Sequence, residues 1–169
     1  MHEYGATSED FGQIAVVARK HAANNPNAFF YGKPITLEDH QASRYIAEPL
    51  HLLDCCQESD GGVAIVIVSP ERAKDLKQKP VTIAGAASGS GRDQFIMTSY
   101  YRDALPELAE MGLVGDQLYA QSGLGPADMD MAILYDHFTP YTLIQLEELG
   151  FCGRGEAKDF VSQPGALEV

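Results

Sequence analysis

The chain has 169 residues, with 24 acidic and 12 basic side chains, so its formal net charge is −12 at pH 7. This balance argues against a nucleic-acid partner, because nucleic-acid binding needs clustered lysine and arginine. Hydrophobic residues make up 45% of the sequence, which is ordinary for a globular domain. No apolar run approaches the roughly 20 residues of a membrane span, and the N-terminal sequence MHEYGATSED has no signal-peptide pattern.

The three cysteines are Cys55, Cys56 and Cys152. They have no CxxC spacing typical of a metal site, and adjacent cysteines rarely pair with each other. We therefore expect reduced thiols that pack as small hydrophobic side chains, no metal site and a cytoplasmic protein.

The first part of the chain is predicted to be helical. The sequence TSED at residues 7–10 is a capping-box pattern, and it begins a helix that ends near residues 24–26. A second such start at Thr36 predicts a helix over residues 36–47. Between the two helices, residues 25–35 form a loop that contains three aromatic side chains.

Three apolar runs are predicted to be buried strands. The continuous, β-branched sequence VAIVIV at residues 63–68 is the strongest of them, and residues 81–87 and 131–134 are the others. A short helix is expected from Ser69 to about Leu76. A longer, interrupted helical segment over residues 102–122 precedes the third strand, so the pattern favours an α/β layered fold.

Polar residues follow the third strand directly. Tyr135, Asp136 and His137 lie at its carboxyl end, and Asp136 and His137 should point to opposite sides if the strand continues. Thr139 is predicted to be the N-cap of a helix that Gly150 ends in a left-handed conformation. Open α/β sheets often place their chemistry at such a strand-to-helix junction.

Other candidate residues have simpler interpretations. His21, His40 and His51 have no metal-ligand spacing, so we expect hydrogen-bonded structural roles for them. The sequence SGSGR at residues 88–92 looks like a phosphate loop but does not have the spacing of a Walker or dinucleotide motif, and it is interpreted as a surface loop.

Long stretches of the chain resemble the thiolase superfamily. DCCQESDGGVAIVIVSPERA, at residues 54–73, resembles the end of the N-terminal half of such a protein, and residues 1–28 resemble the loop domain before it. GPADMDMAILYDHFTPYTLIQLEELGFCGRGEAKDF, at residues 125–160, resembles the C-terminal half of the non-specific lipid-transfer-protein branch. Within that branch, residues 20–41 and 135–160 are most similar to actinobacterial lipid-transfer-protein aldolases of steroid side-chain degradation.

This resemblance implies a thiolase-like α/β layered fold that is present in part. Residues 1–56 would be the loop or cap region, residues 57–79 the last strand and helix of the N-terminal half, and residues 80–169 the first part of the C-terminal half. The segments that carry the thiolase cysteine and the glycine- and histidine-rich part of the site are expected before Met1 and after Val169. The isolated 169 residues are therefore expected to show no turnover, and their strands should have exposed edges.

The resemblance also implies an activity, which is retro-aldol cleavage of a steroid side-chain β-hydroxyacyl-CoA to a ketosteroid and propionyl-CoA. Coenzyme A enters as part of the substrate, with no further cofactor. The implied partners are a DUF35-type OB-fold protein and a second copy of the full-length subunit. The alternatives are an acyl-CoA thiolase or acetyl-CoA acetyltransferase, which needs a nucleophilic cysteine, and a non-catalytic lipid- or acyl-CoA-binding fragment.

The candidate site residues follow from the same comparison. Tyr135 takes the place of the asparagine or histidine of ordinary thiolases, and the resemblance makes its phenol the catalytic acid or base. As a base it would need its pKa lowered from about 10 by a nearby cation or donor. From spacing alone, Tyr135 is a core tyrosine with its hydroxyl on a backbone carbonyl. His137 is the second choice as a base, and Lys33 is either a ligand for a CoA phosphate or a solvated lysine.

Overall fold

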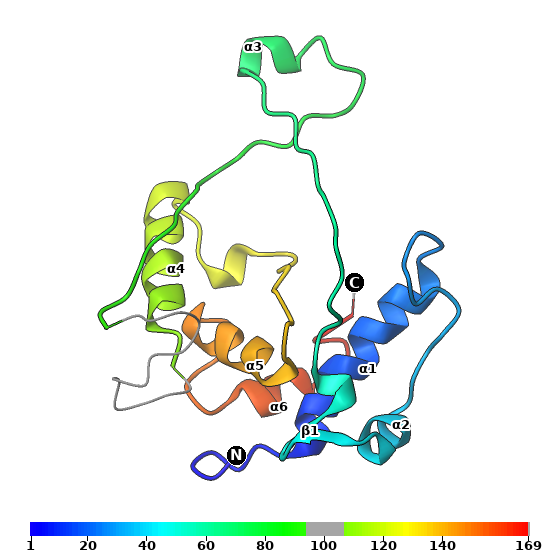
Figure 1. The fold of residues 1–169 in the computed structure, drawn as a ribbon. Coiled ribbons are helices and arrows are strands. Elements are labelled where there is room, and N and C mark those ends of the chain that lie inside the picture. The colour runs from blue at the N-terminus through cyan, green and yellow to red at the C-terminus, as the bar shows by residue number, and fades with distance from the viewer. Residues whose placement is uncertain (94–106, 169) are drawn as a thin grey trace.

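The computed structural model describes residues 1–93 and 107–168. Most of the helices form one body, and the segment that carries the short helix α3 (Pro70–Ala73) extends away from it (Figure 1). The chain returns to the body at Ala86, whose backbone N–H donates to the side-chain oxygen of Gln121 (3.0 Å).

The two predicted capping boxes are confirmed. Helix α1 (Ser8–Asn24) begins at Thr7, whose hydroxyl accepts from the Asp10 backbone N–H while the Asp10 carboxylate accepts from the Thr7 N–H at 2.6 Å. Helix α2 (Leu37–Ala42) has the same reciprocal pair at Thr36 and Asp39. In both cases a local side chain satisfies backbone donors that the helix leaves unpaired.

The predicted extent of the second helix, residues 36–47, is wrong. Helix α2 ends at Ala42, where both the N–H and the hydroxyl of Ser43 donate to the His40 carbonyl. The chain then forms an antiparallel hairpin of β1 (Tyr45–Ala47) and β2 (Leu50–His51), followed by the 3-10 helix η1 (Leu52–Asp54). Backbone groups of residues 45–47, which a longer helix would have bonded along its own axis, pair with β2 in the hairpin instead.

The core lies where three helices meet. Helix α5 (Thr139–Glu148) packs against both α1 and α6 (Ala157–Val161), which also contact each other, and Figure 1 shows the three side by side. The buried hydrophobic side chains of this cluster are Phe11, Ile14, Leu143, Leu146, Ala157 and Val161. The helix ends as predicted, because Gly150 has φ +78°, a conformation that side-chain-bearing residues rarely adopt.

Helix α4 (Ala109–Ser122) packs on the other side of α5. The Tyr119 hydroxyl donates to the Leu149 carbonyl (2.7 Å), and a Cβ on Gly115 would lie 3.1 Å from the Leu149 side chain. The chain then turns at Gly123 and forms the 3-10 helix η2 (Pro126–Asp128) before it runs into the segment that precedes α5.

The three apolar runs do not form the predicted buried strands. Val63 is 91% exposed and Ile133 is 89% exposed, and residues 63–68, 81–87 and 131–134 have no strand partner within the described residues. An isolated strand cannot satisfy its backbone groups or bury its side chains without neighbours. Helix α3 begins where it was expected, with Ser69 as its N-cap, but it ends at Ala73 and not near Leu76.

Helices α1 and α2 approach each other most closely at Gly12. A Cβ there would lie 2.5 Å from Leu37 Cδ1 and 2.9 Å from His40 Nδ1. Leu37 can rotate away, but the His40 ring is fully buried and cannot. Gly12 is therefore fixed by packing, although alanine is the better helix former by about 0.5–1 kcal/mol.

We expect Gly12→Ala to destabilise the protein by roughly 1–3 kcal/mol, because overpacking outweighs the gain in helix propensity. The measurement is the thermal unfolding midpoint. Gly61→Ala is the matched control, because nothing lies within 4 Å of its Cβ. An unfolding midpoint that rises in Gly12→Ala would contradict the close packing described above.

Candidate functional site

Tyr135 and His137 come together in the wall of one cavity. The cavity has a volume of about 400 Å³ and lies between α4, α5 and the extended segment before α5. Its lining is mostly apolar and comprises Ser88, Gly89, Leu108, Glu110, Met111, Val114, Tyr135, His137, Tyr141 and Gln145. A concave apolar site with a few converging polar groups is the usual form of a small-molecule site.

Tyr135 is not the core tyrosine that its spacing suggested. The residue is 69% exposed, and its ring stacks on the His137 ring with 4.9 Å between centroids and 16° between planes. The phenol is thus held beside an imidazole at the cavity wall.

The ring nitrogens of His137 are unpaired within the described part of the chain. The centroid of the Tyr141 ring lies 4.5 Å from that of the His137 ring, and both nitrogens of the His137 ring are shielded from solvent. Neither nitrogen has a hydrogen-bond partner among the residues that the structure describes. Buried polar atoms are normally paired, so an unpaired imidazole at a cavity wall is suited to a ligand or a water molecule.

Gln145 holds the backbone on which Tyr135 is mounted. This side chain is 4% exposed, and its Nε2 donates to the carbonyls of Tyr135 (2.8 Å) and Tyr141 (3.1 Å). The sequence carried a signal for this role, because Gln145 is a polar residue between apolar ones on a helix expected to pack on more than one side.

A buried carboxylate joins the N-terminal region to the start of α5. Asp54 Oδ1 accepts from His40 Nε2 (2.8 Å) and from Thr139 Oγ1 (2.6 Å), and Asp54 Oδ2 accepts from the His51 backbone N–H (2.8 Å). The prediction that Thr139 is the N-cap is wrong, because helix α5 begins at Thr139 itself and its hydroxyl donates to Asp54 instead. The structural roles expected for His40 and His51 agree with these contacts.

The backbones of the same two regions also pair. The Cys56 N–H donates to the His137 carbonyl (2.9 Å), and Cys55 and Phe138 form an isolated antiparallel bridge. Asp54 could not be identified from the sequence as part of the site, since nothing local relates it to Thr139, 85 positions away.

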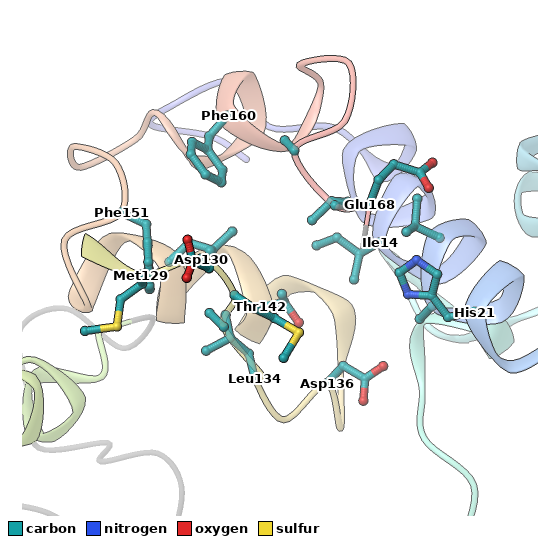
Figure 2. A pocket seen from close by; sticks show the side chains of 17 residues that line it. Ile14, His21, Met129, Asp130, Leu134, Asp136, Thr142, Phe151, Phe160 and Glu168 are labelled. Atoms are coloured by element: carbon teal, nitrogen blue, oxygen red, sulfur yellow. The ribbon is translucent and has the colours of Figure 1, made fainter. Parts of the chain in front are cut away.

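Asp136 faces a second cavity, opposite His137, as the alternation of an extended segment predicts. Figure 2 shows this cavity, whose volume is about 400 Å³, with Asp136 at its edge and Ile14, Leu134 and Phe160 along its walls. His21 also lines it, and its Nε2 is shielded from solvent without a partner among the described residues. This cavity is lined by neither Tyr135 nor His137, and its walls are a mixture of apolar and polar side chains.

Lys33 lies away from the cavity of Tyr135 and His137, whereas part of the loop at residues 88–92 lines it. Lys33 is exposed beside the Phe29 ring, with 5.3 Å from Nζ to the centroid, and does not line the cavity of Tyr135 and His137. Ser88 and Gly89, from the loop interpreted as a surface loop, are exposed but contribute to that cavity wall.

Within residues 1–93 and 107–168, no three His, Cys, Asp or Glu side chains are grouped so that they could hold a metal ion. In the same ranges, no helix is long and apolar enough to cross a membrane.

Known proteins share both the sequence and the fold of this chain. Residues 97–168 match the family described as thiolase C-terminal domain-like. The whole chain is 71% identical to a steroid side-chain-cleaving aldolase of Thermomonospora curvata and 70% identical to a 17-hydroxy-3-oxo-4-pregnene-20-carboxyl-CoA lyase of Mycobacterium tuberculosis. A solved structure, the Ltp2-ChsH2(DUF35) aldolase, matches 99% of this chain with a TM-score of 0.95 and 71% identity.

The chain is thiolase-like. The resemblance found in its sequence is confirmed, and the small sheet and the helices agree with a partial thiolase-like α/β fold. The chain spans 43% and 44% of the length of the two curated relatives and 44% of the matching chain in the solved structure.

Two of the three cysteines of this thiolase-like chain are poor nucleophiles. Burial, with the nearby carboxylates of Glu147 and Glu156, raises the pKa of the Cys152 thiol from its ordinary 9.0 to about 11. Burial and then the charge of Asp54 raise the pKa of Cys55 as well. Because the thiolate is the reactive form, these environments disfavour covalent catalysis.

We expect iodoacetamide at pH 8 to alkylate the exposed Cys56 first and Cys152 last. A pKa of about 11 in place of 9.0 lowers the thiolate fraction of Cys152 roughly a hundredfold, and its labelling should rise with pH until it approaches that value. Peptide mass spectrometry over a pH series measures the order. Preferential labelling of Cys152 at neutral pH would contradict the assignment.

Proposed function

We propose that this chain contributes Tyr135 to a thiolase-fold lyase that performs retro-aldol cleavage of a steroid side-chain β-hydroxyacyl-CoA, giving a ketosteroid and propionyl-CoA. The observation that carries the proposal is the Tyr135 phenol at the wall of an apolar cavity, stacked on an imidazole whose two ring nitrogens have no partner among the described residues. The curated relatives named above, a steroid side-chain-cleaving aldolase and a carboxyl-CoA lyase, support the same reaction class.

The reaction needs two proton transfers. A base removes the proton of the β-hydroxyl, the Cα–Cβ bond breaks to give a ketone and the enolate of the CoA thioester, and an acid then protonates Cα. In this proposal Tyr135 lies at the reacting carbons and acts as either the base or the acid. A ring nitrogen of His137 binds the substrate β-oxygen or the water molecule that exchanges the proton.

The cavity fits the acyl part of such a substrate. Leu108, Met111 and Val114 offer apolar contact to a bulky hydrocarbon group, and the polar groups lie together on the side of Tyr135. Lys33 remains our proposal for a CoA phosphate contact, since it is exposed and its loop resembles the loop domain of thiolases. A metal or a further cofactor has no role in the proposed steps.

The assembly is also part of the proposal. We propose a DUF35-type OB-fold protein as the partner, because the matching solved structure is described as an Ltp2-ChsH2(DUF35) aldolase. A homodimer of the full-length subunit, within the cytoplasm, completes the proposal. The high fold similarity over 99% of this chain supports the use of that structure as a guide.

The alternative functions make different demands on the same residues. An acyl-CoA thiolase needs a reactive cysteine, and the raised pKa values of Cys55 and Cys152 argue against those two. A binding protein without catalysis would use the cavity but would not need the phenol of Tyr135.

We expect Tyr135→Phe to lower kcat for acyl-CoA cleavage by roughly a hundredfold or more, because removal of a general acid or base typically costs 10²–10⁴. The KM should change little, since the ring remains. The assay uses the full-length protein with its DUF35 partner and follows release of propionyl-CoA by chromatography.

Tyr31→Phe is the matched control, because Tyr31 is also exposed but lies in the aromatic loop away from this cavity. It should retain normal turnover. Equal activity of the Tyr135 and Tyr31 variants would remove Tyr135 from the mechanism, and tight binding of the acyl-CoA without any cleavage by the unmodified protein would favour the binding function.

A further inference from the structure

We infer that the buried Asp54–Thr139 contact, supported by His40, is a positioning device that fixes His137 and the start of α5 relative to the reacting groups. Asp54 and Thr139 are thus positioning residues and not catalytic ones, since neither lines the cavity of Tyr135 and His137. The inference rests on the proposed function for its kinetic consequence, but its structural part stands on the contacts alone.

The hydrogen bonds around Asp54 give its carboxylate a single orientation. The carboxylate is 1% exposed, and its two oxygens receive three donors from three different segments. The amide nitrogen of Gln41 donates to His40 Nδ1 (3.1 Å), so the proton on His40 lies at Nε2 and points to Asp54. Every donor in the set therefore has a fixed direction.

The same contact controls where His137 lies. Thr139 is two residues from His137, and its hydroxyl is tied to Asp54 at 2.6 Å. Two residues after Asp54, the Cys56 N–H donates to the His137 carbonyl (2.9 Å). The backbone around His137 is consequently held by two hydrogen bonds, which we call the ladder. One is from the Cys56 N–H to the His137 carbonyl, and the other is from the Thr139 hydroxyl to the buried Asp54 carboxylate.

Positioning by this ladder differs from ordinary core packing. The apolar cluster of α1, α5 and α6 stabilises α5 along its length, but nondirectional contacts set the ring of His137 less sharply than charge-assisted hydrogen bonds do. A small displacement of a reacting group can cost up to roughly a hundredfold in rate. Loss of the Thr139 hydroxyl should therefore affect turnover more than substrate binding.

The test compares Thr139→Val, which has the same shape but no hydroxyl, with Thr139→Ser, which keeps the hydroxyl. Both are made in the full-length protein with its DUF35 partner. We expect Thr139→Val to lower kcat by roughly tenfold to a hundredfold with KM within about twofold, and Thr139→Ser to restore most of the loss. The second readout is the imidazole NMR signal of His137 in protein with 15N-labelled histidine, assigned with a His137→Gln sample.

Altered His137 signals in Thr139→Val, recovered in Thr139→Ser, support the inference. Unchanged His137 signals with unchanged kcat would overturn it, and so would equal losses in both variants, since the hydroxyl would then not matter. If Thr139→Val does not fold, His40→Phe removes the Nε2 donor to Asp54 from helix α2 and should give the same loss of kcat. Full activity in Tyr135→Phe would refute the catalytic assignment, while the NMR comparison would still decide the positioning role.

Discussion

The buried carboxylate of Asp54 is the constraint on which the arrangement of this chain depends. A charge removed from water must be compensated by donors, and Asp54 receives them from its own turn at His51, from α2 at His40 and from α5 at Thr139. Removing one of these donors by mutation would leave the buried charge with an uncompensated oxygen, at a cost of several kcal/mol. These hydrogen bonds therefore hold the three segments together.

What the sequence predicted correctly is local. The capping boxes at Thr7 and Thr36 and the left-handed Gly150 depend on residues within a few positions of one another, and all three are present. The strand predictions failed for the opposite reason. VAIVIV at residues 63–68 has the composition of a central strand, but burial needs neighbours on both sides, and the described residues provide none.

The candidate site divides in the same way. Tyr135 and His137 were found by resemblance and by their place at a strand-to-helix junction, and the structure brings them into one cavity. Their exact chemical roles stay predictions. Asp54 and Gln145, which hold them, were not predicted, because one contact spans 85 residues and the other is a side chain bonded to a backbone carbonyl ten residues away. Asp54 leaves no periodic pattern that sequence reasoning could detect, whereas Gln145 stands out only as a polar residue between apolar ones on its helix.

The segment before α5 keeps the alternation of a strand although, among the described residues, its strand-like pairing is limited to the single bridge of Cys55 and Phe138. Asp136 faces one cavity and His137 the other, so each surface of the segment has a different environment. Helix α5 supplies the fixation that a sheet would usually provide, since Gln145 binds the Tyr135 carbonyl and Thr139 is anchored to Asp54. A site mounted in this way is preorganised by the helix that follows it, and this role accounts for two of the buried polar residues of α5, Thr139 and Gln145.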